Sequence, residues 1–468
     1  MEKGDSQPMG RIVIASNRTA TPGAATAGGL AVALKEALAE EGGVWFGWSG
    51  EVLDRETRGV ELYVDGDVDF ALANLTTAEY EGYYLGYANR ALWPVCHYRV
   101  DLAEFDDDAF EMYEAVNRRF GRLLAQLLRK DDIVWIHDYH FMLLARELRD
   151  SGWRGPTGFF LHIPFPAPEM FTALPQHARI ARALAEFDLI GFQTQADADN
   201  FRRYLSEVHD AEAIEDGRLR VFGRTIRIGA FPIGIDPGDF AASAADPKAR
   251  KGADKLAKIM EDRALVLGVD RLDYSKGLPQ RIEAFGRLLE ENESMRGKVS
   301  YVQIAPVSRQ DVDAYADLRE EVDRLSGRIN SDFADLDWTP VRYMARGYPR
   351  ETLAGLYRLA RVGLVTPLRD GMNLVAKEFV AAQDPDDPGV LILSEFAGAA
   401  EQLDGAILIN PYDISGMSEA IRRAVEMPLA ERKERWQRLR ERVWSEDVTW
   451  WRKRYVEALR AVRGTGDG

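Results

Sequence analysis

Two cations stand close together in one loop of the second half of the chain. Arg271 and Lys276 belong to the run RLDYSKG, which follows an apolar segment at 265–269 and leads into an amphipathic one. Loop cations and the free amides at the start of a helix together make an anion site. The spacing therefore favours diphosphate binding, with both cations stabilising a leaving phosphate. Plain surface charge with Asp273 as the ion-pair partner is the alternative that spacing leaves open.

A second run, PLRDGMNLVAKE at 367–378, combines acids, a glycine and an expected helix start near Asn373. Gly371 permits close approach of the backbone to a ligand, and helix-start amides can bind a phosphate or a sugar hydroxyl. Asp370 and Glu378 can accept hydrogen bonds from sugar or ribose hydroxyls. Asp370 as an ordinary helix cap is the competing interpretation.

Two weaker anion-site signals each involve a single arginine. The run SNR ends at Arg18 and is followed by the pair Gly28 and Gly29, as in a phosphate or sugar loop after a first strand. Arg309 follows another expected strand and could reach a second phosphate, although an isolated loop arginine is usually solvated.

Metal binding has little support in the sequence. His137 and His140 stand close together without a third ligand at metal-site spacing. Strings of the DxD type occur at 65–67, 67–69 and 311–313, and a chain this acidic produces them by chance. We therefore expect neither a metal nor another cofactor.

The elements that must position these residues are short apolar strands alternating with amphipathic helices. The expected strands of the first half lie at residues 11–16, 133–136, 158–161 and 189–192. Those of the second half lie at residues 265–269, 300–304, 341–344, 362–365 and 390–393. Two such series joined by a Pro/Gly segment at 232–237 predict an α/β fold with two doubly wound parallel sheets. Because the polar runs follow the strand ends, we expect a ligand cleft between the two domains.

Composition restricts the class of partner. The chain has 468 residues, 60 basic and 76 acidic, and its formal net charge of −16 argues against nonspecific binding to nucleic acid or anionic membranes. No apolar run reaches the roughly 18–20 residues of a membrane span, and residues 1–10 do not resemble a signal peptide. Cys96 is the single cysteine, which excludes an intrachain disulfide and favours a reducing, cytoplasmic setting.

Ordered motifs along nearly the whole chain resemble those of the trehalose-6-phosphate synthase family. They are SNR at Ser16, AGGL at Ala27, WFGWSGE at Trp45, ALWPVCHYR at Ala91, WIHDYH at Trp135, FFLHIPFP at Phe159, PIGI at Pro232, RLDYSKGLP at Arg271, QIAPVSR at Gln303, TPLRDGMNLVAKEFVAAQ at Thr366 and LSEFAGAA at Leu393. The resemblance implies the GT-B architecture, in which two Rossmann-like domains face a central cleft. It implies a flexible extension at 1–10, an acceptor-binding domain at 11–238 plus 448–463, and a nucleotide-sugar domain at 239–447.

The resemblance also implies roles for the residues that match these motifs. The acceptor, glucose 6-phosphate, would be bound by Arg18, Tyr84, Trp93, Asp138 and Arg309. The donor would be bound by Gly29, His162, Arg271, Lys276, Asp370, Gly371, Met372, Asn373, Leu374, Val375 and Glu378. The catalytic groups would be Arg271, Lys276, Asp370, His162 and Asp138.

The implied reaction moves glucose from a nucleoside-diphosphate glucose, with UDP-glucose favoured over GDP-glucose, to glucose 6-phosphate. Attack on the front face through an oxocarbenium-like state would retain the anomeric configuration, and the leaving β-phosphate oxygen would take the acceptor proton. Catalysis would then rest on positioning and charge stabilisation. Two alternatives are a GT-B relative with another acceptor and a non-catalytic, sugar-phosphate-binding regulatory subunit. Homo-oligomer formation is left open.

Overall fold

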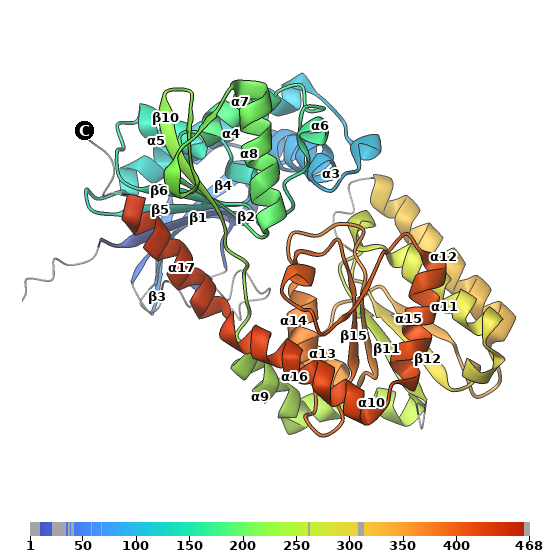
Figure 1. Cartoon of the computed structure of the whole chain (residues 1–468). Coiled ribbons are helices and arrows are strands. Elements are labelled where there is room, and N and C mark those ends of the chain that lie inside the picture. The colour runs from blue at the N-terminus through green and yellow to red at the C-terminus, as the bar shows by residue number, and fades with distance from the viewer. Residues whose placement is uncertain are drawn as a thin grey trace, which may run out of the picture. The chain divides into compact units, whose positions relative to one another are not determined.

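The structure is a computed structural model that describes residues 10–20, 34, 35, 38, 42–57, 59–66, 68–260, 263–307 and 313–462. It divides into two compact units, Met1–Pro232 with Trp451–Gly468 (unit 1) and Ile233–Trp450 (unit 2). Each unit has a sheet of its own with helices packed around it (Figure 1). Within the described ranges, no helix is long and apolar enough to cross a membrane.

The sheet of unit 1 has ten strands in the order β3-β4-β2-β1-β5-β6-β7-β10-β9-β8. Their bounds are β1 (Ile12–Arg18), β2 (Gly43–Leu53), β3 (Glu61–Asp65), β4 (Val68–Thr76), β5 (Ile133–His137), β6 (Thr157–Phe160), β7 (Leu189–Phe192), β8 (Glu212–Ala213), β9 (Arg218–Val221) and β10 (Arg224–Ala230). The seven central strands pair in parallel, as expected. Every residue of β5 and β7 is buried, which is why continuous apolar runs predicted these strands.

Both edges of this sheet are antiparallel, which the expectation of a purely parallel sheet missed. The turn between β9 and β10 has positive φ at Phe222 (51°) and Gly223 (78°). Positive φ at both central residues is the signature of the two-residue hairpin turn whose twist matches the strands. A connection this short can only join antiparallel neighbours.

The helices of unit 1 carry several of the expected site residues at their ends. Their bounds are α2 (Thr77–Glu79), the π-helix η1 (Tyr80–Leu92), α3 (Trp93–Cys96), η2 (Val100–Leu102), α4 (Asp107–Leu127), η3 (Tyr139–Phe141), α5 (Leu144–Asp150), α6 (Pro168–Phe171), α7 (His177–Leu184), α8 (Gln195–His209), η4 (Glu215–Gly217) and α17 (Val448–Ala461). The last turns of α17 belong to unit 1, where the Tyr455 hydroxyl donates to the Phe159 carbonyl at 2.9 Å and its ring stacks on Trp135.

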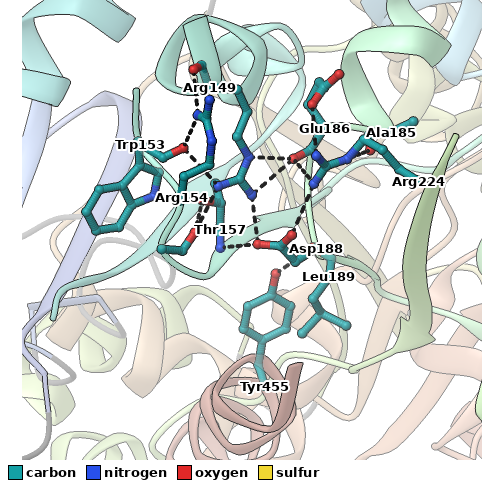
Figure 2. A network of polar contacts seen from close by, with 11 residues as sticks. Arg149, Trp153, Arg154, Thr157, Ala185, Glu186, Asp188, Leu189, Arg224 and Tyr455 are labelled. Carbon is teal, nitrogen blue, oxygen red and sulfur yellow. Dashed lines mark hydrogen bonds and ion pairs between the residues drawn. The ribbon is translucent and has the colours of Figure 1, made fainter. Parts of the chain in front are cut away.

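A polar network fixes the starts of three neighbouring strands in unit 1. Figure 2 shows Arg149 and Arg224 turned toward the two carboxylate oxygens of Asp188, at 2.8 and 3.2 Å. The same carboxylate accepts from the Thr157 amide at 2.8 Å, so it joins the first residues of β6, β7 and β10. Charge-assisted bonds of this kind are stronger than neutral ones and hold the strand register at this edge.

The sheet of unit 2 has six parallel strands in the order β13-β12-β11-β14-β15-β16, as the doubly wound prediction requires. The strands are β11 (Ala264–Val269), β12 (Val299–Ile304), β13 (Val341–Met344), β14 (Val362–Val365), β15 (Val390–Ser394) and β16 (Ile407–Ile409). The helices are α9 (Pro237–Ala245), α10 (Pro247–Met260), η5 (Tyr274–Lys276), α11 (Leu278–Glu291), η6 (Glu293–Met295), α12 (Asp313–Phe333), α13 (Arg350–Leu359), α14 (Leu374–Ala382), η7 (Gly398–Glu401), α15 (Ile414–Glu426) and α16 (Leu429–Ser445). Figure 1 shows α13 and α14 on one side of this sheet and α11 and α12 on the other.

Candidate active site

In unit 2, the two runs singled out in the sequence meet beyond the ends of β11 and β14. Lys276 ends η5, and its Nζ lies 2.5 Å from Oδ2 of Asp370, which follows β14. Lys276 is 8% exposed, so the pair is held away from bulk water. Lys276 is thus an element of a buried polar cluster and not a solvated surface cation. Arg271, at the start of the same loop, is exposed.

The Asp370 carboxylate is also bound by the next helix. Asn373 stands at the N-cap position of α14 but does not cap it, because its Nδ2 donates to Asp370 Oδ2 at 3.0 Å. The competing interpretation of Asp370 as an ordinary helix cap is therefore wrong. Asn373 Oδ1 is buried and has no hydrogen-bond partner in the described part of the chain. Asn373 also has φ +73°, a left-handed conformation that costs a non-glycine residue on the order of 1–3 kcal/mol.

Arg281, a buried arginine that was not predicted from the sequence, anchors the loop that carries Lys276. Arg281, fully buried on α11, donates to the Lys276 carbonyl at 2.6 Å and to Asp270 Oδ2 at 2.6 Å. The same guanidinium reaches Thr366 Oγ1 at 3.0 Å, at the end of β14. One side chain therefore joins the ends of β11 and β14 to the loop that carries the predicted phosphate-binding cation.

The first turn of α14 continues into two ionisable residues with shifted pKa values. Burial raises the pKa of Glu378 to about 7, against the opposing effects of Arg350 and the Tyr357 hydroxyl. Burial lowers the pKa of Lys377 to about 7, although its Nζ donates to the Ile233 carbonyl at 2.7 Å and to Gln402 Oε1 at 2.8 Å. Both directions follow from the cost of a charge in a low-dielectric interior.

In unit 1, Arg18 ends β1 beside an aromatic group. Its guanidinium carbon lies 5.9 Å from the centre of the Trp48 ring, and the side chain is exposed. Gly50, at φ +96°, makes room for it, since a Cβ there would lie 2.8 Å from Arg18 Nη2. The Tyr84 ring packs on Trp48, with 5.6 Å between the ring centres. Two of the expected acceptor residues, Arg18 and Tyr84, thus share one aromatic neighbour.

Asp138 occupies the turn after β5 in a strained conformation. Its φ is +73°, and its backbone amide donates to the Phe160 carbonyl while its Oδ1 accepts from the His162 amide at 3.2 Å. Trp93 packs on Tyr139, the residue after Asp138, with 5.7 Å between the ring centres. Of the five non-glycine residues with positive φ in the described part of the chain, Asp138 and Asn373 are both predicted site residues. Strain of this kind persists where surrounding contacts enforce it, and it clusters at functional sites.

His162 belongs to a row of hydrogen-bonded side chains. His137 Nδ1 lies 3.0 Å from His162 Nε2, and Gln193 Nε2 lies 3.3 Å from His162 Nδ1. If the Gln193 amide donates, His162 must carry its proton on Nε2 and donate to His137. The sequence singled out His137 only as a weak metal ligand, whereas the structure makes it the partner that orients His162. Burial lowers the pKa of both rings, that of His162 to about 3.

These neutral histidines predict acid sensitivity. Their folded pKa values lie below the unfolded value near 6.5, so the unfolded chain binds more protons as the pH falls below about 6.5. Each ring that stays neutral in the folded state should lower the unfolding free energy by about 1.2 kcal/mol between pH 7 and pH 5.5. We therefore expect a fall of about 2.5 kcal/mol from the two rings together. The measurement is urea denaturation across this range. His137→Gln should shrink the fall by about half, whereas His209→Gln, at a less buried ring, should leave most of it. An equal fall in the His137→Gln variant would contradict the assignment.

Two predicted site residues, Gly29 and Arg309, lie outside the described residues. The other predicted residues form two groups, one in each unit. In unit 1, Arg18 ends β1, and Tyr84 and Trp93 lie on the helical segments η1 and α3. Asp138 follows β5, and His162 follows β6. Those of unit 2 follow β11 and β14 or start α14: Arg271, Lys276, Asp370, Gly371, Met372, Asn373, Leu374, Val375 and Glu378. Each group stands at the carboxyl end of a parallel sheet, where such folds bind ligands.

The chain has two doubly wound sheets. One carries a cation and helix-start amides, and the other an arginine, aromatic rings and a carboxylate. This combination defines the class as a GT-B glycosyltransferase. The model of glycosyltransferase family 20 matches residues 9–461. The chain belongs to glycosyltransferase family 20.

Curated and solved relatives are similar over almost their whole length. The trehalose-6-phosphate synthase of Sinorhizobium fredii is 48% identical over 458 residues, covering 97% of this chain and 99% of the relative. A UDP-forming α,α-trehalose-phosphate synthase from Burkholderia vietnamiensis superposes with a TM-score of 0.95 at 47% identity, covering 97% of both chains. Its Burkholderia xenovorans counterpart, in complex with glucose 6-phosphate, has a TM-score of 0.93 at 48% identity, covering 96% of this chain and 100% of the other. An Escherichia coli structure bound with UDP-2-fluoro glucose has a TM-score of 0.93 at 43% identity, covering 96% and 98%.

Proposed function

We propose that the chain is a trehalose-6-phosphate synthase that moves glucose from UDP-glucose to glucose 6-phosphate, releasing UDP and α,α-trehalose 6-phosphate. The observation that carries the proposal is the Lys276–Asp370 pair at the start of α14, in a member of a family whose similar synthases are described as UDP-forming. Lys276 supplies a fixed cation, and Asp370 an acceptor for sugar hydroxyls.

The donor is assigned to unit 2. Lys276 and Arg271 bind the diphosphate, helped by the amides of Leu374 and Val375 at the start of α14. Asp370 and the backbone of Gly371, Met372 and Asn373 hold the hydroxyls of the transferred glucose. The buried, unpartnered Asn373 Oδ1 supports a polar ligand here, because such atoms are usually satisfied. Glu378 holds the ribose, and His162 of unit 1 contacts the glucose near its 6-hydroxyl. Gly29 is assigned to the diphosphate by resemblance alone.

The acceptor is assigned to unit 1. Arg18 binds the phosphate of glucose 6-phosphate, a role that Arg309 shares by resemblance. Tyr84, which is half-buried, offers aromatic surface to the sugar ring, and Asp138 accepts from its hydroxyls. Trp93 is only 4% exposed and is assigned to the acceptor by resemblance alone. The exposed Arg18 guanidinium lies over the Trp48 ring and beside Gly50, where it is accessible to a phosphate.

The proposed transfer uses both assignments. The bond between the anomeric carbon and the β-phosphate oxygen breaks, and the anomeric carbon bonds to the acceptor hydroxyl oxygen on the same face. The proton of that hydroxyl passes to the departing β-phosphate oxygen, so the α configuration is retained. Negative charge grows on the diphosphate as the bond breaks, and Arg271 and Lys276 stabilise it more in the transition state than in the ground state. No carboxylate nucleophile is required, unlike in most retaining glycosidases.

A donor panel with glucose 6-phosphate tests the function. We expect release of UDP from UDP-glucose to exceed release of GDP from GDP-glucose, an α,α-linked phosphorylated product, and activity that persists in excess chelator. Arg18→Ala should raise the KM for glucose 6-phosphate at least about tenfold with a smaller change in the KM for UDP-glucose. Arg129→Ala, at an exposed arginine outside the proposed site, is the control. Equal damage to both KM values would count against the acceptor assignment.

The setting of the enzyme is part of the same proposal. A cytoplasmic location is supported by the single cysteine, Cys96, which is buried and free. Homo-oligomer formation is tested by sedimentation of the purified chain.

A further inference from the structure

A charged cavity lies in unit 1, among residues that have no part in the proposed reaction. It measures about 330 Å³ and is lined from helices α4, α5 and α7. Its cationic lining consists of Arg118, Arg122, Arg146 and Arg179, and its acidic lining of Glu114, Glu147 and Asp150. Four guanidinium groups against three carboxylates give a local excess of positive charge in a chain whose net charge is −16.

Helix geometry places these side chains together. Glu114, Arg118 and Arg122 recur every fourth residue and so share one face of α4. Gly121 lets α5 approach closely, because a Cβ there would lie 2.5 Å from the Cβ of Glu147. The cavity therefore belongs to the helix packing itself and not to a loop.

The ion pairs inside the cavity leave two of its cations available. Arg179 pairs with Glu114 at 2.5 Å, and Arg118 stands 3.8 Å from Glu147. Arg122 and Arg146 are exposed and form no hydrogen bond or close ion pair in the described ranges, although both act electrostatically on the Glu147 carboxylate. Burial raises the pKa of the half-buried Glu147, and the nearby Arg118, Arg122 and Arg146 oppose that shift. Each open guanidinium offers a planar fork of donors that matches a phosphate.

We propose that this cavity is a second anion site, which binds a small phosphorylated metabolite through Arg122 and Arg146. Its volume lies at the lower end of the range of about 300–1,000 Å³ typical of small-molecule sites. Inorganic phosphate would fill only part of it, which favours a phosphate monoester with an organic group. The three acids would exclude highly charged polyanions and select a ligand that also carries hydrogen-bond donors, such as hydroxyls.

Helix α4 connects this site to the acceptor turn. On a neighbouring face of α4, the Tyr113 hydroxyl donates to the Tyr139 carbonyl at 2.6 Å, and Asn117 Nδ2 donates to the His140 carbonyl at 3.0 Å. Those carbonyls belong to η3, which begins directly after Asp138. A ligand that binds one position of α4 better than another must also bias the position of this turn. We expect occupancy of the cavity to change the affinity for the acceptor.

The test is isothermal titration of the full chain at low salt, with sn-glycerol 3-phosphate and, separately, inorganic phosphate as probes. The enzyme is first saturated with UDP and glucose 6-phosphate, so that the proposed substrate sites are filled. The variant is Arg122→Ala/Arg146→Ala. The matched control is Arg129→Ala/Arg328→Ala, which removes the same charge from two exposed arginines elsewhere.

We expect one saturable site in the wild type and in the control, and binding weakened at least about tenfold in the Arg122→Ala/Arg146→Ala variant. Tighter binding of glycerol 3-phosphate identifies an organic phosphate as the ligand class, and equal binding identifies free phosphate. In the wild type and the control, but not in the Arg122→Ala/Arg146→Ala variant, the probe should also shift the KM for glucose 6-phosphate. Absence of saturable binding, or equal binding in both double variants, overturns the proposal whatever the outcome of the synthase assay.

Discussion

Replacing Lys276 by methionine is expected to lower kcat about 100- to 1,000-fold, the usual cost of removing one preorganised donor from a charge-stabilising site. The reason is the position of its Nζ, which is nearly buried and fixed by Asp370 at 2.5 Å. A cation held there needs no reorganisation when charge develops on the departing diphosphate. Methionine keeps most of the side-chain volume and removes the charge together with the hydrogen bond to Asp370, which Asn373 Nδ2 still contacts at 3.0 Å.

The measurement is initial velocity at saturating UDP-glucose and glucose 6-phosphate, with thermal unfolding to verify that the variant is folded. Lys298→Met, at an exposed lysine of unit 2, controls for loss of charge. Lys276→Arg should recover part of the rate, since it restores the cation with a different geometry. A folded Lys276→Met enzyme with kcat within about threefold of the wild type would remove Lys276 from the catalytic groups.

Nine parallel strands could be predicted closely, and all of these except β13 are almost wholly buried, whereas the parallel strands β2, β4, β10 and β16 were not predicted. The expected segments 189–192, 341–344 and 362–365 coincide with β7, β13 and β14, and the others differ by one or two residues at an end. Continuous burial makes a strand an uninterrupted apolar run, which is readable without knowledge of its neighbours. Strand β1 extends to Arg18, beyond the expected end at 16, because polar residues at its carboxyl end still pair with β2.

Two of the elements that were missed, β3 and the π-helix η1, depend on tertiary context. Strand β3 is exposed along most of its length and has no apolar run to mark it. The π-helix Tyr80–Leu92 contains Gly82 and Gly86, and it is stabilised by packing of Tyr84 on Trp48 and His140, which lie far away in the sequence. No local pattern distinguishes a helix of this kind from an ordinary one.

The sequence predicted which types of residue form the candidate site, but not which of them contact one another. The run at 367–378 indicated an acid and a helix start, but the pairing of Asp370 with Lys276 joins residues 94 positions apart. Such a pair depends on which strands are neighbours in the sheet. Arg281 had a signal that could have been noticed, because it stands among Leu278, Ile282 and Phe285 on the apolar face of its helix. A cation on such a face must have a buried partner.

That buried partner makes Arg281 the residue whose loss should destabilise unit 2 most. Arg281→Met leaves the carboxylate of Asp270 without its 2.6 Å partner in a site that is 8% exposed. Breaking a buried pair from one side costs about 3–5 kcal/mol, much of it from the charge left behind. The Lys276 carbonyl also loses a 2.6 Å donor, so the loop that carries Lys276 should loosen and kcat should fall together with stability.

The double variant Arg281→Met/Asp270→Asn separates these causes. Removing the stranded charge should recover most of the lost stability, because the penalty lies in an uncompensated carboxylate. It should not recover kcat, because neither substituted side chain can hold the Lys276 carbonyl. Urea midpoints of the wild type, both single variants and the double variant give the coupling energy, and initial velocities give the catalytic effect. A double variant no more stable than Arg281→Met would show that the guanidinium acts through its contacts to Thr366 and Gln303 and not through its charge.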